Sequence, residues 1–327
     1  MLIDWWKTRS TVRAINGALL QHGDIKVAKA ADHSKTNVHW YCFSTIDEQL
    51  GKKIRGSGAG FSDQMGIVRA WGEFVERYSF RATAHVDDSA TTSNGFASHI
   101  THEQAKESAV AELIERDVFL SAWLLRIPAL PVDPKNLKDQ AFNLKRLDKL
   151  RAEGFETSMG LIGKCMGLFV GIIAIYSSNE LVVATAAKRS IEELVSHLTR
   201  EAVVSVSDLK SSRAPRPIET LTVDAEPMDH LKYYLDFPVN DFLATWFKPQ
   251  NEVRHFPDFR YTFDDLTPSN EFARKTGYLV YRAKSSECQN LWFGTTKPEV
   301  VNLERLSQIA GQQITYEEVN HEPHPLA

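Results

Sequence analysis

The chain of 327 residues has few cysteines and no arrangement of histidines that suggests a metal centre. Its three cysteines, Cys42, Cys165 and Cys288, lie far apart in the sequence. An odd number of widely spaced cysteines argues against a disulfide framework and against a zinc site, and it predicts three reduced, mostly buried thiols. The eleven histidines likewise show no metal-ligand spacing.

Long hydrophobic runs and an excess of one charge are also missing. The most apolar run, residues 166–176, is too short to span a bilayer. Residues 1–7 lack the apolar core of a signal peptide. The formal net charge of −4 offers no broad field for nucleic acid or an anionic membrane. We therefore expect a cytoplasmic protein that binds neither nucleic acid nor membrane.

What the sequence does contain is the alternation of an α/β protein with a sizeable core. Apolar residues recur at helical spacing after Ser62 and again after Thr101, which predicts two long helices with hydroxyl N-caps. The first fifty residues show no long helix pattern. Further helices are expected at residues 145–154 and 191–209, and strands at residues 161–176, 181–185, 277–282 and 291–293. For residues 161–176 two alternatives stay open, one continuous strand or a strand broken near Lys164. The predicted fold class is α/β, with mixed sheets and long packed helices.

One internal repeat carries most of the chemical information. Residues 70–77, AWGEFVER, reappear as residues 109–116, AVAELIER. In each copy two glutamates lie three positions apart and therefore share one helix face. Each copy also has a hydroxyl residue, Ser62 or Thr101, eleven positions before its first glutamate. The repeat thus predicts equivalent carboxylates on two helices, at Glu73, Glu76, Glu112 and Glu115.

Paired glutamates are common on solvated helix faces, but these two pairs are interleaved with bulky apolar residues. Carboxylates in such surroundings should be partly buried. Neighbouring carboxylates about 5 Å apart repel by roughly 3 kcal/mol at an effective dielectric near 20, so a buried cluster needs a cation. Neither helix carries a lysine on that face. Because Mg²⁺ prefers oxygen ligands and binds through carboxylates together with substrate phosphates, the repeat favours a magnesium–polyphosphate site.

A glycine-rich segment, residues 56–60, precedes the first of these helices. Backbone N–H groups in such a segment can cradle a phosphate at a helix N-terminus. The segment matches neither the P-loop nor the dinucleotide-binding pattern, however. A flexible turn is therefore an equal alternative.

Together these segments resemble the two core ATP-binding segments of the YcaO family. The glycine-rich segment leads into residues 73–77, EFVER, and residues 93–95, SNG, lead into residues 112–117, ELIERD. The second copy has the fuller pattern, because Ser108 stands ahead of its glutamates. The resemblance is strongest over residues 56–123 and continues more weakly to the end of the chain.

The resemblance implies a single YcaO-like ATP-binding domain over residues 1–327, with ATP held between the two helices and with Mg²⁺ as a second cofactor. The implied magnesium ligands are Glu73, Glu76, Glu112 and Glu115. The implied nucleotide contacts are Arg116, Gln104 and Ser108, although Gln104 could instead complete a capping box with Thr101.

The family resemblance also assigns a role to the tail, residues 321–327. Its Pro323-His324-Pro325 is a shortened form of the alternating prolines that end the azoline-forming members of the family. Prolines favour an extended, pre-ordered tail. Pro325 and the terminal carboxylate of Ala327 are therefore the implied catalytic elements.

The implied activity is that of an ATP-dependent peptide cyclodehydratase, or heterocyclase, which makes thiazolines and oxazolines in a ribosomally made peptide, as in antibiotic biosynthesis. A Cys, Ser or Thr side chain attacks the preceding amide carbonyl, and phosphorylation turns the amide oxygen into a leaving group. The expected partners are the precursor peptide, a separate leader-peptide-binding protein and a dehydrogenase subunit. Two alternatives stay open: formation of a thioamide or amidine, and a non-catalytic nucleotide-binding scaffold.

The sequence departs from the family pattern in its third segment. Glu201 is present, but Val204 and Val206 stand where glutamine and arginine are usual. Another arginine is expected to supply the missing charge. The candidates are Arg200, Arg213 and Arg282.

Overall fold

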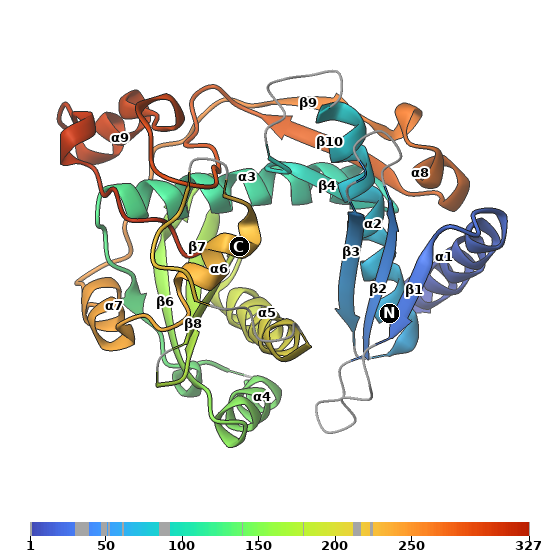
Figure 1. Ribbon diagram of the computed structural model, residues 1–327, viewed down its shortest axis with the longest axis horizontal. Coiled ribbons are helices and arrows are strands. Elements are labelled where there is room, and N and C mark those ends of the chain that lie inside the picture. The colour runs from blue at the N-terminus through green and yellow to red at the C-terminus, as the bar shows by residue number, and fades with distance from the viewer. Residues whose placement is uncertain are drawn as a thin grey trace. The chain divides into compact units, whose positions relative to one another are not determined.

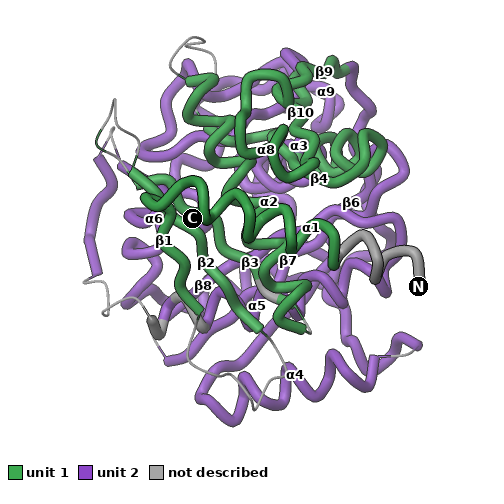
Figure 2. The backbone as a smooth tube through the Cα atoms, turned by 90° about the vertical axis from the view of Figure 1, so that its right-hand side faces the viewer, with its two compact units in different colours: residues 1–112, 261–284 green, residues 113–260, 285–327 purple. Residues whose placement is uncertain are grey.

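The protein is described by a computed structural model. It covers residues 2–29, 39–46, 51, 53–60, 62–84, 92–138, 140–178, 180–211, 217–222 and 225–326. The chain divides into two compact units, each drawn from two stretches of sequence: unit 1 is residues 1–112 and 261–284, and unit 2 is residues 113–260 and 285–327 (Figure 2). Helix α3 (His102–Leu124) begins in unit 1 and ends in unit 2. The single domain expected over residues 1–327 stays a prediction.

Unit 1 contains two three-stranded antiparallel sheets (Figure 1). The first has the order β1-β2-β3, with strands β1 (Lys26–Lys29), β2 (His39–Ile46) and β3 (Lys53–Gly60). Helix α2 (Asp63–Ala84) packs on β2 and β3, and α1 (Leu2–Gln21) packs on α2. The second sheet has the order β4-β10-β9, with strands β4 (Phe96–His99), β9 (Thr262–Asp265) and β10 (Leu279–Lys284). Helix α8 (Glu271–Thr276) contacts β10.

Unit 2 is built on one antiparallel sheet of order β5-β6-β7-β8. Its strands are β5 (Leu130–Pro131), β6 (Glu156–Cys165), β7 (Leu168–Tyr176) and β8 (Leu181–Lys188). Helix α5 (Ile191–Ser211) packs on β7 and β8, and α4 (Ala141–Ala152) packs on α5 and β6. The shorter helices are α6 (Pro227–Tyr233), α7 (Val239–Trp246) and α9 (Leu303–Ala310). The 3₁₀ turns of the chain are Pro134–Asn136, Thr267–Ser269, Pro298–Val300 and Tyr316–Glu318.

The glycine-rich segment of residues 56–60 belongs to strand β3, so the flexible-turn alternative is wrong. Its glycines lie directly on helix α2. A Cβ added at Gly56 would come within 2.0 Å of the Phe74 nitrogen, and one at Gly58 within 2.2 Å of the Ala70 nitrogen. Glycine is needed here because any side chain would force the strand away from the helix. The close approach brings the backbone of β3 to the glutamates of α2.

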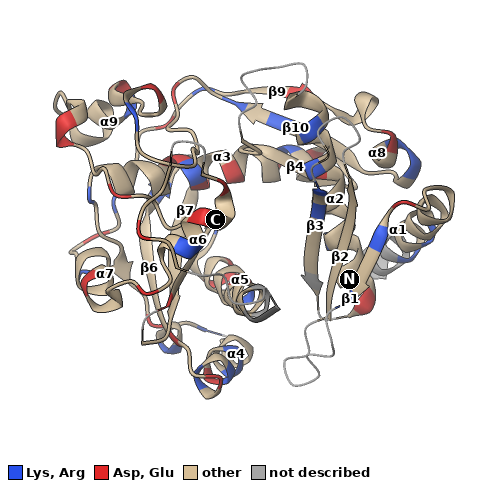
Figure 3. Cartoon of the chain, in the orientation of Figure 1, with Lys and Arg blue, Asp and Glu red and all other residues tan. Residues whose placement is uncertain are grey.

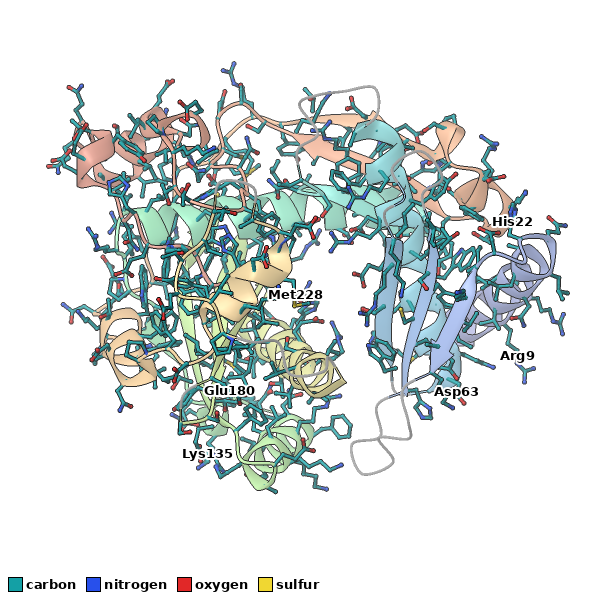
Figure 4. All side chains as sticks on the ribbon, in the orientation of Figure 1. Arg9, His22, Asp63, Lys135, Glu180 and Met228 are labelled. Carbon is teal, nitrogen blue, oxygen red and sulfur yellow. The ribbon has the colours of Figure 1, made fainter. Side chains whose placement is uncertain are left out.

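The start of helix α2 is fixed by hydrogen bonds from both sides. The Ser62 hydroxyl accepts from the Met65 nitrogen at 3.3 Å, as the expected N-cap. Asp63, labelled in Figure 4, accepts from the Tyr41 hydroxyl at 2.6 Å and lies 3.0 Å from the Lys29 ammonium. These two hydrogen bonds lower the pKa of Asp63 well below its usual range. An ionised carboxylate in the first turn also complements the helix dipole.

Three sequence-based expectations differ from the structure. Residues 2–21 form a long helix, α1, although the first fifty residues show no long helix pattern in the sequence. Thr11, Ile15 and Ala18 make its buried face, and the polar Thr11 interrupts the apolar pattern that would have revealed it. Residues 161–176 are the hairpin of β6 and β7, so the continuous strand is wrong and the break near Lys164 is confirmed. Residues 291–293 are not a strand: the Trp292 carbonyl is bonded by the His324 side chain, and the next residue, Gly294, donates to the His230 side chain.

Charges are dispersed over the elements. Figure 3 shows acidic and basic residues interspersed along α4, α5 and α8. Among the helices that the structure describes, none is long and apolar enough to cross a membrane. The interspersed charges agree with the small net charge of the sequence.

In unit 2 a buried ion pair joins helix α3 to the C-terminal segment. The Arg305 Nη2 lies 2.6 Å from the Asp117 Oδ2, and both side chains are fully buried. The Gln289 nitrogen donates to the Asp117 Oδ1 at 2.8 Å, and Arg305 donates to the Pro257 carbonyl at 2.8 Å. Helix α9 and Gln289, which precedes it, are thereby fastened to the helix that carries Glu115 and Arg116.

Candidate functional site

In unit 1 helix α2 carries Glu73 and Glu76, and the first part of α3 carries Glu112. Glu73 is held from two sides. The Ser57 backbone N–H donates to the Glu73 Oε2 at 3.2 Å, and the Arg77 guanidinium lies 3.7 Å from the Glu73 Oε1. Arg77 also donates to the Ser93 hydroxyl at 2.6 Å. The two segments singled out in the sequence, residues 56–60 and 93–95, thus meet through Glu73 and Arg77.

Glu76 is half-buried and lies within reach of the other acidic side chains. Burial raises the pKa of Glu76 well above its ordinary value of 4.5, and the negative charges of Glu112 and Glu73 raise it further. The charge of Arg77 offsets only part of this. A further positive charge, such as a bound cation, would lower the pKa of Glu76 and favour its ionised form. This is the crowding of carboxylates that the repeat predicted.

The donor set of this group suits Mg²⁺, since it consists of carboxylate oxygens. Within the described part of the chain, no three Asp, Glu, His or Cys side chains are grouped closely enough to form a preformed metal site. Magnesium is usually held by one or two carboxylates together with phosphate oxygens and water. A pair of repelling carboxylates therefore fits an ion that arrives together with a nucleotide.

In unit 2 the second glutamate of the repeated motif, Glu115, is positioned by strand β8. The Thr185 hydroxyl donates to the Glu115 Oε1 at 2.6 Å. The Arg116 Nη1 lies 3.5 Å from the same oxygen and 3.4 Å from the Thr185 hydroxyl. Thr185 was not identified from the sequence. The only indication was a hydroxyl residue in an otherwise apolar strand.

Helix α5 adds a group of charged side chains around Glu201. The Glu201 Oε1 lies 3.5 Å from the Arg200 Nε and 3.4 Å from the His197 Nε2, and Arg200 and His197 are themselves 2.6 Å apart. Burial lowers the pKa of Lys188 at the end of β8, whereas the charge of Glu115 raises it and that of Arg200 lowers it. Lys188 is therefore a neighbour of both Glu115 and the Arg200 group.

The three arginines considered as replacements for the missing one lie in different places. Arg200 belongs to the group beside Lys188 and Glu115. Arg282 lies on β10 in unit 1, buried, with its guanidinium 5.2 Å from the ring centre of Phe96. Arg213 lies outside the described residues. Among the described candidates, Arg200 is the one near the acidic motif in unit 2.

The other nucleotide contacts implied by the resemblance lie along α3. Gln104 and Ser108 are exposed and precede Glu112 at spacings of four residues, so these three side chains share one face of the helix. The Thr101 hydroxyl accepts from the Gln104 nitrogen at 3.3 Å and donates to the Gln104 Oε1 at 2.9 Å. Gln104 therefore takes part in the helix cap, and its nucleotide role stays a prediction.

The tail is ordered against unit 2. The Trp123 Nε1 donates to the Glu322 carbonyl at 2.9 Å, the Tyr234 hydroxyl donates to the Pro323 carbonyl, and His324 and Pro325 are buried. Ala327 lies outside the described residues. The catalytic role of Pro325 and Ala327 stays a prediction.

Comparison with known proteins decides the family. Residues 82–300, more than half of the chain, match the family model described as YcaO cyclodehydratase, ATP- and Mg²⁺-binding. The chain belongs to the YcaO family. The predicted membership is confirmed, and ATP and Mg²⁺ are confirmed as the cofactors that the family model describes. No protein of curated function matches the chain.

Solved structures show the same fold at low sequence identity. A heterocyclase in complex with substrate and cofactor has a TM-score of 0.64 and 12% identity, over 92% of this chain and 55% of that one. YcaO from Methanopyrus kandleri, bound with AMPPCP and Mg²⁺, has a TM-score of 0.63 and 13% identity, over 86% of this chain and 91% of that one. The E. coli microcin synthetase McbBCD complex with pro-MccB17 bound has a TM-score of 0.56 and 12% identity, over 80% of this chain and 88% of that one.

These likenesses confirm the predicted α/β fold with long packed helices. The named strands of the described residues pair antiparallel, so their sheets are not mixed. The YcaO fold in this chain spans 55% of the length of the heterocyclase that it resembles.

Proposed function

We propose that the protein is an ATP- and Mg²⁺-dependent cyclodehydratase of peptide backbone amides, forming thiazolines or oxazolines from Cys, Ser or Thr of a ribosomally made peptide. The observation that carries the proposal is the acidic group of Glu73, Glu76 and Glu112, in which repulsion and burial hold the Glu76 pKa high. Membership of a family described as ATP- and Mg²⁺-binding cyclodehydratases supports it. The heterocyclase and microcin synthetase among the similar folds support the choice of a peptide substrate.

Each side chain of the proposed site has a defined task. Glu73, Glu76, Glu112 and Glu115 would hold Mg²⁺. Arg116 would contact phosphate, and the Thr185 hydroxyl orients Glu115 by its 2.6 Å hydrogen bond. When bound, Mg²⁺ and ATP supply charge neutralisation and the phosphoryl group that makes the amide oxygen a leaving group. The protein's own contribution is to bind, neutralise and align the reacting groups.

A reconstituted reaction tests the proposal. A short peptide encoded beside this chain, a leader-peptide-binding partner, the protein, ATP and Mg²⁺ are incubated together, and the peptide is weighed by mass spectrometry. We expect the loss of one water for each ring formed, only when ATP and Mg²⁺ are both present. We expect the isolated chain to be slow, because binding energy from a remote leader segment would place the amide productively.

The alternatives differ in mass or in acid stability. Exchange of an amide oxygen for sulfur would identify a thioamide-forming enzyme, and an amidine formed with an amine would resist the mild acid that reopens an azoline. An unchanged peptide together with tight ATP binding would favour the non-catalytic scaffold.

Arg200 should supply the charge that the third segment lacks. Replacing Arg200 with alanine should raise the KM for ATP by roughly 10- to 100-fold, since a hydrogen bond to a charged group contributes about 1.5–3 kcal/mol. Arg200→Lys should recover part of the loss. Steady-state ATPase measurements give both constants.

The matched control for this change is Arg151→Ala in the same unit. Arg151 is exposed and is paired with Asp148 at 3.1 Å and Glu156 at 3.3 Å. It should leave the KM for ATP unchanged. Equal KM values in the Arg200→Ala and wild-type enzymes would remove Arg200 from the nucleotide site.

A further inference from the structure

Unit 2 holds two fully buried histidines, His230 on α6 and His324 in the tail. Their rings are stacked, with centres 4.4 Å apart and an interplanar angle of 28°. Both lie beside the segment of Trp292 and Phe293, whose rings contact His324 and His230 edge-on. The pair has no role in the proposed site.

Hydrogen bonds to the four ring nitrogens define the protonation of the pair. The Gly294 backbone N–H donates to the His230 Nε2 at 2.8 Å, so this nitrogen carries no proton. The His230 Nδ1 then donates to the His324 carbonyl at 2.7 Å. In His324 the Nε2 donates to the Trp292 carbonyl at 2.5 Å, and the Nδ1 accepts from the Leu326 backbone N–H at 3.3 Å. Both rings are therefore neutral, with opposite tautomers.

Protonation of either ring would break this arrangement. A second proton on His230 would point at the Gly294 N–H, and one on His324 would point at the Leu326 N–H, so that two donors would face each other. Burial lowers the pKa of both histidines. A positive charge on His230 would lower the pKa of His324 further.

The charged groups around the pair come from two helices. Arg116 on α3 disfavours a positive charge on His324 and lowers its pKa. Asp229 on α6 favours a charge on His230, but burial outweighs it. The influence of Arg116 also shows that the tail lies close to this motif residue. The buried histidines thus connect the C-terminal segment with the phosphate-contacting arginine of the proposed site.

We infer that the neutral His230–His324 pair is a positioning element, which fastens residues 324–326 to helix α6 and to the 292–294 segment, and that acid releases these residues. For its effect on turnover, the inference rests on the proposed function. His230 supplies the donor to the tail's backbone, and His324 anchors the tail to the 292–294 segment. Neither ring touches the reacting atoms, so both act through the placement of the tail.

The direction of the pH effect follows from the lowered pKa values. A histidine whose folded-state pKa lies below its usual 6.5 stabilises the docked tail fully above pH 6.5. As the pH falls from 6.5 to the folded-state pKa, the released tail takes up the proton more readily, and this stabilisation is lost. Each pH unit below 6.5 should favour release by up to about tenfold for each histidine. The window for release is therefore the mildly acidic range.

Hydrogen–deuterium exchange on the full chain between pH 7 and pH 5 tests this independently of any activity. After correction for the intrinsic exchange rate, the backbone amides of His324 and Leu326 should exchange at least tenfold faster at pH 5 than at pH 7. His324→Gln retains a donor near the Nε2 position but does not titrate, so its exchange should lose most of the acid response. His230→Asn, which retains the donor near the Nδ1 position, should behave in the same way.

His321→Gln is the matched control, because His321 is exposed and lies three residues before His324. It should keep the wild-type acid response. If the corrected exchange of the His324 and Leu326 amides in the wild-type protein does not change between pH 7 and pH 5, the inference is overturned, even if the variants fail to fold. The same acid response in His324→Gln as in wild type would also overturn it.

Turnover adds a readout that separates the two proposals. The wild-type kcat for ATP-dependent dehydration should fall from pH 7 to pH 5 more steeply than that of His324→Gln, with little change in the KM for ATP. Acid-induced exchange without any dehydration at any pH would count against the proposed function while leaving the positioning role of the histidines intact.

Discussion

Replacing Glu76 with glutamine should abolish magnesium-dependent ATP binding and at the same time stabilise the metal-free protein. Glutamine preserves the shape of the side chain but removes a ligand charge. We expect the affinity for Mg·ATP to fall by at least about 100-fold, the upper end of the loss seen when a residue that merely supports a metal ligand is changed. Calorimetric titration with a non-hydrolysable ATP analogue measures it.

The gain in stability follows from the raised pKa of Glu76. A carboxyl group whose folded-state pKa lies above 4.5 costs stability once the pH rises past that value, because the folded protein then resists ionisation. The neutral glutamine avoids this cost. Without metal, Glu76→Gln should therefore melt roughly 2–4 °C higher than wild type at pH 7, as expected for about 1 kcal/mol. The difference should shrink as the pH approaches 4.5.

Glu107→Gln, an exposed glutamate on α3, is the matched control and should change neither quantity. Unchanged affinity of Glu76→Gln for the nucleotide would return the pair of Glu73 and Glu76 to an ordinary structural role. A lower melting temperature of the metal-free variant would show that an unidentified cation already compensates the carboxylates.

The largest effect on stability is expected from breaking the buried pair of Asp117 and Arg305. Replacing Arg305 with methionine leaves the Asp117 carboxylate buried with no counter-charge, and this should cost roughly 3–5 kcal/mol of unfolding free energy. The side chains are both fully buried and 2.6 Å apart, so solvent cannot replace the lost partner. Urea denaturation followed by circular dichroism measures the loss.

A second substitution separates the charge from the packing. Asp117→Asn removes the unpaired charge and keeps an oxygen that can accept from the Gln289 nitrogen. The double variant should therefore be more stable than Arg305→Met alone. Additive losses in the two single variants would show that Asp117 and Arg305 do not interact energetically.

The acidic repeat illustrates what local pattern determines. Helix periodicity and the spacing of three residues place Glu73 with Glu76, and Glu112 with Glu115, whatever the rest of the chain does. The long helices after Ser62 and Thr101 follow from the same local rules, since their N-caps and apolar faces are written within a few turns. The family resemblance rested on these segments, and the match to the family model confirmed it.

Helix α1 and residues 291–293 show where local pattern failed. The buried face of α1 contains a threonine, and the helix is stabilised by its contact with α2 rather than by its own composition. Residues 291–293 have the composition of a strand, but no strand among the described residues pairs with them. Instead, the Trp292 carbonyl is bonded by His324, and Gly294, the next residue, is bonded by His230. Backbone contacts with side chains that are distant in the sequence cannot be predicted from the spacing of residues within a segment.

The sequence by itself determined the family, the repeated carboxylates and the order of the long elements, because each depends on residues within a few turns of one another. The tertiary structure decided that the glycines of β3 serve close packing on α2, that Thr185 orients Glu115, and that His230 meets His324. The partners in these contacts are separated by up to 94 positions in the chain. Only the folded backbone brings them together, and burial then sets their protonation by removing water.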